Sequence, residues 1–360
     1  MTYYLKEGEL LWPTPESNLD ISGKIPVGTY TVGLDERRGF YLKLITDFTV
    51  QGKVYGKTNH QAERILNTFE SRPNATGVLL NGEKGSGKTM LAKLISKLAA
   101  ERQISTIVIN SPYAGDMFNA FIQSIDEPAV IVFDEFEKIF DDEKQEKTLT
   151  LLDGVFPTKK LFIITANDKW KINQNMRNRP GRIFYMIDYK GLDTAFIEEY
   201  CVDNLNNKEH IPQICRLTML FDAFNFDMLK ALVEEMNRYN ETPNEAMQML
   251  NAKPADGGRA KFTLEVFVRG KKVESDDIDP SFIHGNPISR ECLEIAVPSG
   301  KKDDDGDPEF DFYEITPRDL KKIDVENGKF TYVLNEGQKD MVVFVFTKES
   351  ERSYNYLDLV

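Results

Sequence analysis

Three glycines, two lysines and a threonine stand together in the segment NGEKGSGKT. In the pattern Gly82-x4-Gly87-Lys88-Thr89, the glycines let the main chain curl so that successive N–H groups can point at one anion. The lysine can then reach the β- and γ-phosphates of a nucleotide, and the threonine hydroxyl can hold Mg²⁺. The apolar run TGVLL precedes the segment and a helical pattern follows it, which is the context that a phosphate-binding loop requires.

This whole segment is expected to contact nucleotide, and the predicted cofactors are ATP and Mg²⁺. A glycine-rich turn that matches the pattern by chance is the alternative, and the motifs further along the chain argue against it. The predicted nucleotide-binding residues of the segment are Gly82, Glu83, Lys84, Gly85, Ser86, Gly87, Lys88, Thr89 and Met90.

A pair of carboxylates follows a second apolar run, in AVIVFDEFEKIF. Asp134 can hold the Mg²⁺ shell together with Thr89, and Glu135 can orient and deprotonate an attacking water. Carboxylates at strand ends are also common as solvated groups. Their position after a phosphate loop, with a strand between, favours the catalytic interpretation.

These residues must be positioned by the elements around them. The runs GVLLN, STIVIN, AVIVFDE and LFIITAN alternate with helical stretches that begin near Lys88, Gly115 and Lys144. Runs that are apolar on both faces suit strands buried in a parallel sheet, and the alternation predicts a doubly wound α/β domain.

Four segments differ in composition and in residue pattern, and the sequence predicts a domain for each. Residues 1–53, rich in β-formers and turn signals, predict a small N-terminal β-rich domain. Residues 54–190 predict the α/β core, and residues 191–252, where strands disappear, predict a small helical lid. After the break NAKPADGGRAK, residues 259–360 predict an acidic β-rich domain. Its stretch DDDGDPEFDFYE lacks the ligand spacing of a calcium loop and predicts a solvated hairpin loop.

The order of these motifs resembles an AAA-type ATPase of the AAA+ superfamily, over roughly residues 54–250. LFIITAND resembles the sensor-1 strand, which implies that Asn167 holds the lytic water or the γ-phosphate. VYGKT resembles the segment that cups adenine through main chain near Tyr55 and Gly56. TLTLLDG resembles the helix end LLxxLDG of the AAA branch.

NRPGRI resembles the LRPGR motif of the same branch, whose arginines reach the neighbouring subunit's nucleotide. The resemblance implies that Arg179 and Arg182 are such trans-acting fingers. A guanidinium can stabilise the charge that spreads over the phosphoryl oxygens during transfer. Alternatively these arginines and Arg177 pair with surface carboxylates.

Two features depart from the family pattern or leave it open. The helix FNFDMLKALVEEMNRY offers Lys230 at most in place of a sensor-2 arginine, as in many AAA proteins. Tyr113-Ala114-Gly115 resembles an aromatic pore loop that grips an extended polypeptide. The same PYAG segment is also an ordinary turn, with Pro112 starting it and Gly115 closing it.

Composition narrows the class of partner. The net charge of −13 argues against duplex DNA as the main partner, because phosphate neutralisation needs a basic surface. No apolar run is long enough to cross a membrane and no signal peptide is evident, so we expect a cytoplasmic protein. The three cysteines, Cys201, Cys215 and Cys292, are widely spaced and predict free thiols.

Three functions remain in competition at this stage. The first is a ring-forming, Mg²⁺-dependent ATPase, a homo-oligomer expected to be a hexamer, that remodels or disassembles a protein partner. The second is a nucleic-acid motor or loader on the same engine, and the third is an ATP-gated assembly scaffold that hardly turns over. Compact AAA proteins with unfamiliar flanking sheets occur in phages as well as in cells, so a phage-encoded source is one expectation.

Overall fold

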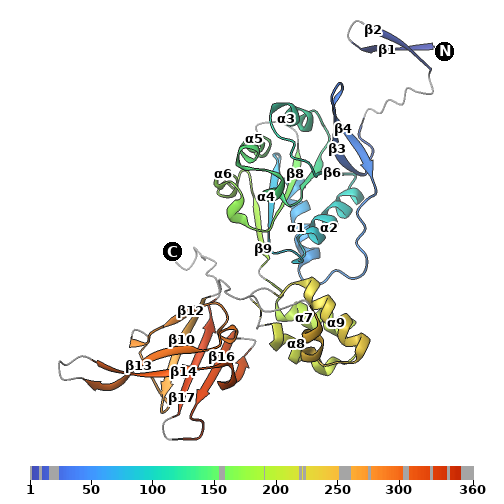
Figure 1. Cartoon of the computed structure of the whole chain (residues 1–360). Helices are drawn as coiled ribbons and strands as arrows, with labels where there is room; N and C mark the ends of the chain where they lie inside the picture. The colour runs from blue at the N-terminus through green and yellow to red at the C-terminus, as the bar shows by residue number, and fades with distance from the viewer. Residues whose placement is uncertain are drawn as a thin grey trace. The chain divides into compact units, whose positions relative to one another are not determined.

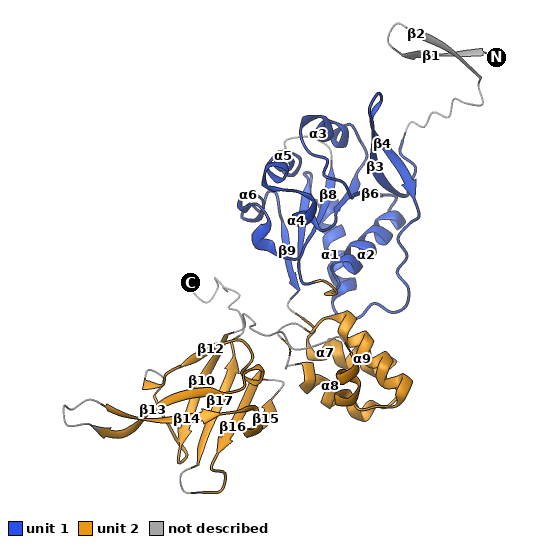
Figure 2. Ribbon diagram, viewed as in Figure 1, with its two compact units in different colours: residues 1–83, 87–189 blue, residues 84–86, 190–360 orange. Residues whose placement is uncertain are grey.

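The computed structural model describes most of the chain, as two compact units (Figure 2). Unit 1 comprises residues 1–83 and 87–189, and unit 2 comprises residues 84–86 and 190–360. The main chain of residues 2–7 and 10–15 is described without side chains. The other described residues are 24–153, 159–189, 191–218, 221, 224–250, 261–274, 277–302, 308–324, 327–338 and 341–349.

Unit 1 is built on a seven-stranded sheet with the order β4-β3-β6-β7-β8-β5-β9 (Figure 1). All neighbouring strands are parallel except β3 and β4, which pair antiparallel. The sequence prediction of a doubly wound parallel sheet is therefore confirmed. The strands are β3 (Thr29–Asp35), β4 (Gly39–Ile45), β5 (Thr76–Gly82), β6 (Ser105–Ile109), β7 (Ala129–Phe133), β8 (Lys160–Ala166) and β9 (Tyr185–Tyr189).

Both faces of this sheet are buried, as the unbroken apolar runs predict. In β7, Ile131 and Phe133 join one core cluster while Val130 and Val132 join the other. Helices α1 (Thr58–Ser71) and α2 (Lys88–Glu101) supply the second cluster. The opposite face is covered by α3 (Asp116–Gln123), α4 (Phe136–Ile139), α5 (Asp142–Leu152) and α6 (Gln174–Arg177) (Figure 1).

The N-terminal strands differ from the prediction of a separate domain over residues 1–53. Strand β3 pairs in parallel with β6, and Tyr30 and Val32 are buried in the core cluster of unit 1. The physical reason is that an isolated hairpin is marginal in water, whereas β3 and β4 extend an existing sheet. Strands β1 (Thr2–Glu7) and β2 (Leu10–Pro15) form their own antiparallel pair.

The first part of unit 2, for which the sequence predicts a helical lid over residues 191–252, contains four α-helices among its described residues. Polar side chains start its helices: Asp193 accepts a hydrogen bond from Phe196 N (2.8 Å), and Thr242 forms a capping box with Glu245. Cys201 and Cys215 are buried among these helices and, like Cys292, are free thiols. The helices are α7 (Thr194–Asn204), α8 (Ile211–Thr218), α9 (Phe226–Tyr239) and α10 (Pro243–Met249).

The C-terminal part of unit 2 is β-rich, as predicted. A six-stranded antiparallel sheet and the β13–β14 hairpin share one core, to which alternate residues such as Phe330, Phe344 and Phe346 contribute. Residues 303–307 of the acidic stretch lie outside the described residues. The strands are β10 (Lys261–Val268), β11 (Lys271–Lys272), β12 (Phe282–His284), β13 (Leu293–Lys302), β14 (Pro308–Ile315), β15 (Leu320–Asp324), β16 (Lys329–Leu334) and β17 (Val342–Lys348).

Candidate active site

The predicted phosphate-site residues follow three neighbouring strands of the core sheet. The phosphate loop leaves β5, Asp134 and Glu135 follow β7, and Asn167 follows β8. The order β7-β8-β5 places these three strand ends side by side, because the strands are parallel. Ligands bind outside the carboxyl ends of the strands in open α/β sheets. The structure thus brings the predicted groups to the edge where a nucleotide site is expected.

The phosphate loop presents main-chain N–H groups at the start of α2. Gly87 is the N-cap, with φ at 102°, and no side chain caps the helix start. The first N–H groups of a helix have no partner within the helix, and its dipole favours an anion there. A Cβ at Gly87 would lie 3.7 Å from the Tyr189 ring, so the backbone conformation rather than space requires glycine.

Lys88 is the first residue of α2 and is only 7% exposed. Its Nζ donates to the carbonyl oxygens of Gly82 and Glu83, the latter at 2.8 Å, and to Asn167 Oδ1 at 3.2 Å. Burial lowers the pKa of Lys88, and the nearby carboxylates, Glu137 foremost, partly oppose that shift. The ammonium group is held by weak neutral acceptors, which an anionic phosphate can replace.

The carboxylate pair after β7 is locked to the neighbouring strand by Thr165. Thr165 Oγ1 donates to Asp134 Oδ1 at 2.6 Å and accepts from the main-chain N–H of Glu135 at 2.9 Å. Glu135 has a left-handed backbone, with φ at 47°, which costs energy for a residue with a Cβ. Its Oε1 accepts from Lys138 Nζ at 2.6 Å on the exposed side of the turn. The Glu135 carboxylate is thus placed by a strained turn.

Asn167 has a partner that the sequence analysis missed. Glu137 Oε1 accepts from the main-chain N–H of Asn167 at 3.0 Å and from its Nδ2 at 2.9 Å. The signal that could have revealed it is the short spacing in DEFE, which leads into the first turn of α4. Glu137 therefore joins Lys88 and Asn167 in one hydrogen-bonded chain.

Among the described residues, buried polar atoms without a hydrogen-bond partner occur in several parts of the chain, and Asn81 Oδ1, Glu137 Oε2 and the Tyr189 hydroxyl lie at this edge of the sheet. Asp134 and Thr89 offer the hard oxygen donors that Mg²⁺ prefers, so the donor set fits that ion.

The tip of the phosphate loop, Lys84–Ser86, belongs to unit 2 by its contacts. Asn225 Nδ2 donates to Lys84 O at 3.2 Å, and the main-chain N–H of Phe226 donates to Gly85 O at 3.1 Å. Gly85 has φ at 79°, a backbone conformation that favours glycine. Lys84, Gly85 and Ser86 are therefore held at the start of α9.

The remaining predicted nucleotide contacts lie at the surface of unit 1. Met90 is 37% exposed in the first turn of α2, and Thr89 beside it is exposed as well. Tyr55 is half-buried, with Lys53 Nζ 5.1 Å from its ring centroid, and its carbonyl oxygen accepts from Thr58 Oγ1 at 3.3 Å. Gly56 has a positive φ of 64° in the turn before α1. The structure leaves these surface residues accessible to a nucleotide.

The two predicted arginine fingers have different surroundings. The Arg182 guanidinium forms a forked ion pair with Asp153, with Nη2 to Oδ2 at 2.7 Å, and donates to Asn175 O at 2.7 Å. Arg182 as a whole is 8% exposed. Asp153 caps the end of α5, within the TLTLLDG motif, whose last residue lies outside the described residues. Arg182 ties these two motifs together inside one protomer.

Arg179 is exposed, whereas Arg177 is engaged locally. Arg177 Nε donates to Ile172 O at 2.9 Å, and its guanidinium lies 4.7 Å from the Trp170 ring centroid. The arginine segment lies against β5: a Cβ at Gly77 would come within 1.9 Å of Arg182 O. Of the three arginines, Arg179 is the one best placed to reach outward.

Tyr113, the predicted pore-loop aromatic, packs into the core of unit 1. Its ring centroid lies 5.2 Å from that of Phe40 on β4 and 6.0 Å from that of Phe118 on α3. Met117 at the start of α3 is instead 72% exposed. These contacts favour the turn interpretation of PYAG over a gripping loop.

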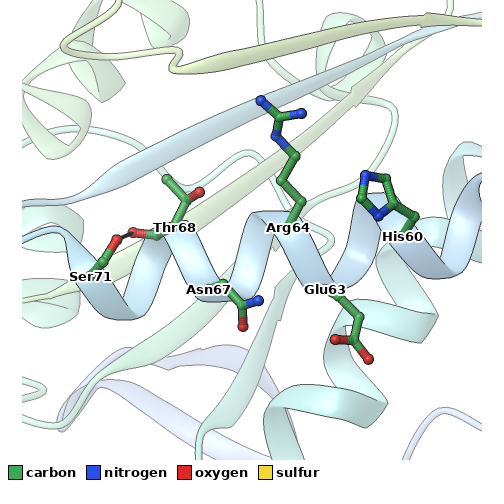
Figure 3. Close-up of a pocket in the computed structure, with 6 residues that line it drawn as sticks. All are labelled: His60, Glu63, Arg64, Asn67, Thr68 and Ser71. Atoms are coloured by element: carbon green, nitrogen blue, oxygen red, sulfur yellow. Dashed lines mark hydrogen bonds between the residues drawn. The ribbon is translucent and has the colours of Figure 1, made fainter.

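A surface hollow lies along α1 (Figure 3). Figure 3 shows that all its lining side chains come from this one helix: His60, Glu63, Arg64, Asn67, Thr68 and Ser71. Thr68 Oγ1 hydrogen-bonds the Tyr185 hydroxyl at 2.9 Å, which ties the helix to β9. None of the described helices is long and apolar enough to span a bilayer.

The sheet order, the phosphate loop at the start of α2 and the carboxylates after β7 together define a P-loop nucleotide-binding protein. Residues 78–188 match the family described as ATPase family associated with various cellular activities (AAA). Over these residues the chain is thus similar to an AAA ATPase domain, which agrees with the resemblance drawn from the motifs.

Curated relatives share this domain over part of their length. An AAA domain-containing protein of Schizosaccharomyces pombe is 34% identical over 174 residues, which cover 43% of this chain and 21% of the relative. The peroxisomal ATPase PEX1 of Homo sapiens is 30% identical over 128 residues, covering 30% of this chain and 10% of PEX1.

Among solved structures, a mutant form of RuvB from Thermotoga maritima overlays with a TM-score of 0.40 and 16% identity. That overlay covers 56% of this chain and 72% of the RuvB chain. The chain spans about a tenth to a quarter of the length of the curated relatives that it matches.

Proposed function

We propose that this protein hydrolyses ATP to ADP and phosphate at the carboxyl edge of the core sheet. One observation carries the proposal: Lys88 of the phosphate loop and Asn167 of β8 are joined by a hydrogen bond, beside the carboxylates that follow β7. Phosphoryl transfer needs positioning and charge stabilisation more than covalent chemistry, and this constellation offers both.

Each residue has a role that follows from its position. Lys88 neutralises the β- and γ-phosphates, and Glu135 takes a proton from the attacking water. Asn167 donates to the γ-phosphate or to that water. Thr89 and Asp134 would hold Mg²⁺, which when bound neutralises charge on the phosphate oxygens. To reach the water, Glu135 must leave Lys138, and exposed ion pairs of this kind contribute little to stability.

The site is completed by a second copy of the chain, in a ring expected to hold six. Arg179 is exposed and lies on the segment that resembles the trans-acting motif, so we assign it the finger role. Arg182 instead holds Asp153, which fixes that segment from within the protomer. A finger from a neighbour makes hydrolysis depend on subunit contact.

The substrate that we propose for this cycle is a protein or protein complex, which the ring remodels or takes apart. The acidic net charge of −13 disfavours a nucleic acid as the main partner. One relative is an ATP-dependent zinc metalloprotease, a name that supports protein-directed work. Work would come from the different affinities of the ATP and ADP states for the subunit contacts.

Turnover of the wild type and of Glu135→Gln tests the enzymatic part. We expect the variant to hydrolyse ATP about 10²- to 10⁴-fold more slowly, because the amide cannot accept the proton of the water. Its affinity for ATP should stay within a few-fold of the wild-type value. Equal turnover would instead favour an ATP-gated scaffold, an interpretation that the Glu135–Lys138 pair also suits. A DNA-dependent and salt-sensitive rise in turnover would favour the nucleic-acid motor.

Mixing two inactive variants tests the shared site. Arg179→Ala lacks the finger but keeps Glu135, and Glu135→Gln keeps the finger. A mixed ring contains interfaces that join an intact Glu135 to an intact Arg179, so mixing should restore part of the turnover. Arg177→Ala is the matched control, and we expect it to be active alone. A mixture that stays as slow as either variant would contradict a site built from two copies.

A further inference from the structure

Glu137 is a second glutamate on the turn after β7, and the phosphate-site motifs assign it no role. It lies in the first turn of α4, two residues beyond Glu135. One oxygen, Oε1, accepts both the main-chain N–H of Asn167 (3.0 Å) and its Nδ2 (2.9 Å). Two bonds from one residue to one oxygen fix both the backbone and the side chain of that residue.

This contact determines which end of the Asn167 amide faces the phosphate loop. An ionised carboxylate can only accept hydrogen bonds, so the amide atom beside Glu137 must be Nδ2. Oδ1 is then the atom that accepts from Lys88 Nζ at 3.2 Å. An amide nitrogen has two N–H bonds, and one of them goes to Glu137. The other remains to donate to a phosphate oxygen or a water.

The two glutamates of this turn have opposite surroundings. Glu135 Oε1 meets Lys138 on the exposed side, where the side chain of Glu135 is 42% exposed. Glu137 points inward, and its Oε2 is buried without a hydrogen-bond partner. Its Oε1 holds Asn167, which in turn accepts a hydrogen bond from Lys88.

We propose that Glu137 is a positioning residue for the reaction: it orients Asn167 so that one amide N–H meets the γ-phosphate, while Glu135 acts on water. This role rests on the proposed function, because it concerns how Asn167 contacts the γ-phosphate of a bound nucleotide. Glu137 itself touches no substrate. Loss of Glu137 should therefore act through Asn167 and leave binding of the rest of the nucleotide intact.

The test compares Glu137→Ala, Glu137→Gln, Asn167→Ala and the Glu137→Ala/Asn167→Ala double variant. For each, the Kd for ADP and for the non-hydrolysable analogue AMP-PNP is measured, along with turnover. Glutamine is the matched control, since its side-chain oxygen can still accept both Asn167 N–H bonds. The Kd ratio of ADP to AMP-PNP is the readout that a merely structural role would not move.

We expect Glu137→Ala to lose about 10- to 100-fold in that ratio, the range for a hydrogen bond to a charged group, with the Kd for ADP within a few-fold. Glu137→Gln should stay close to the wild type. The double variant should match Asn167→Ala, because Glu137 has nothing left to orient. Full additivity, or an alanine variant that discriminates like the wild type, would overturn the role.

Thermal melting of the same four variants without nucleotide measures whether Glu137 and Asn167 are coupled in stability. If Glu137 and Asn167 act as one unit, the double variant should lose no more stability than the more damaged single variant. A wild type that binds no nucleotide would overturn the proposed function and this role with it. A wild type that binds and hydrolyses ATP, with Glu137→Ala unchanged, would overturn the positioning role alone.

Discussion

The two ends of strand β8 each lie beside a buried lysine, and the two lysines differ in what surrounds them. Lys160 is the first residue of β8, whereas Lys88 reaches Asn167, which follows its last residue. They are 1% and 7% exposed. Burial lowers the pKa of both, that of Lys160 to about 8.

At the amino end the ammonium group of Lys160 is held by main-chain carbonyls of one loop. Lys160 Nζ donates to Ile125 O at 2.7 Å and to Glu127 O at 2.9 Å, carbonyls that follow α3. At the carboxyl end, buried atoms such as Glu137 Oε2 have no partner. The same chemical group thus serves as an internal anchor at one end and as part of an open site at the other. Burial of a lysine alone therefore does not identify a functional site.

The largest effect should come from the carboxyl end. Lys88→Met removes the charge that balances the phosphates, and we expect turnover to fall by about 10²- to 10³-fold. We expect thermal stability to fall by less than in a Lys160→Met variant, because Glu83 is exposed and Asn167 is only partly buried, so that water can replace part of the hydrogen bonding that Lys88 provides. Steady-state turnover and a melting curve check the two halves. A large loss of stability would mean that Lys88 is as structural as Lys160.

Lys160→Met should show the opposite behaviour. Removing the ammonium leaves two carbonyls without their donor, and we expect a loss of about 1 to 3 kcal/mol in the free energy of unfolding. Nucleotide affinity should stay within a few-fold of the wild-type value. Urea unfolding and nucleotide titration make the measurement. Unchanged stability together with weakened binding would break the contrast between the two ends.

A smaller effect should appear in the pH dependence of stability. Lys160 is a base whose pKa falls to about 8 in the folded chain from 10.5, so the unfolded chain binds more protons between these values. Stability should rise with pH in this window. Between pH 7 and 9.5 we expect the wild type to gain about 1 to 2 kcal/mol relative to Lys160→Met, measured by urea unfolding. Parallel curves for the two proteins would refute the assignment.

The sequence predicted the core strands and the phosphate loop because both leave strong local signals. Runs such as AVIVF are apolar on two faces, and three glycines beside Lys88 have few other uses. The hairpin β3–β4 was assigned to a separate domain, since its pairing with β6 spans a long stretch of sequence. Pairing of this kind leaves no mark in the local pattern.

Two residues of the site region could not be assigned from sequence for a related reason. Glu137 lies in the same acidic run as Asp134 and Glu135, and only the fold of the turn separates an inward carboxylate from an outward one. The two arginines of NRPGRI are likewise distinguished only by the fold, which pairs one of them with a carboxylate and leaves the other exposed. Arg182 meets Asp153, 29 positions earlier, through contacts that spacing does not encode.

Strand β5 contacts two parts of the site region, and Gly77 makes the second contact possible. One end of β5 continues into the loop that cradles phosphate, and at the other end Gly77 accepts a hydrogen bond from Phe184 N at 2.8 Å and leaves room for Arg182 O. A methyl group there would push the 178–183 segment away from the sheet. In the proposed ring, Gly77 therefore sets the position of the segment that carries Arg179 toward the neighbouring copy.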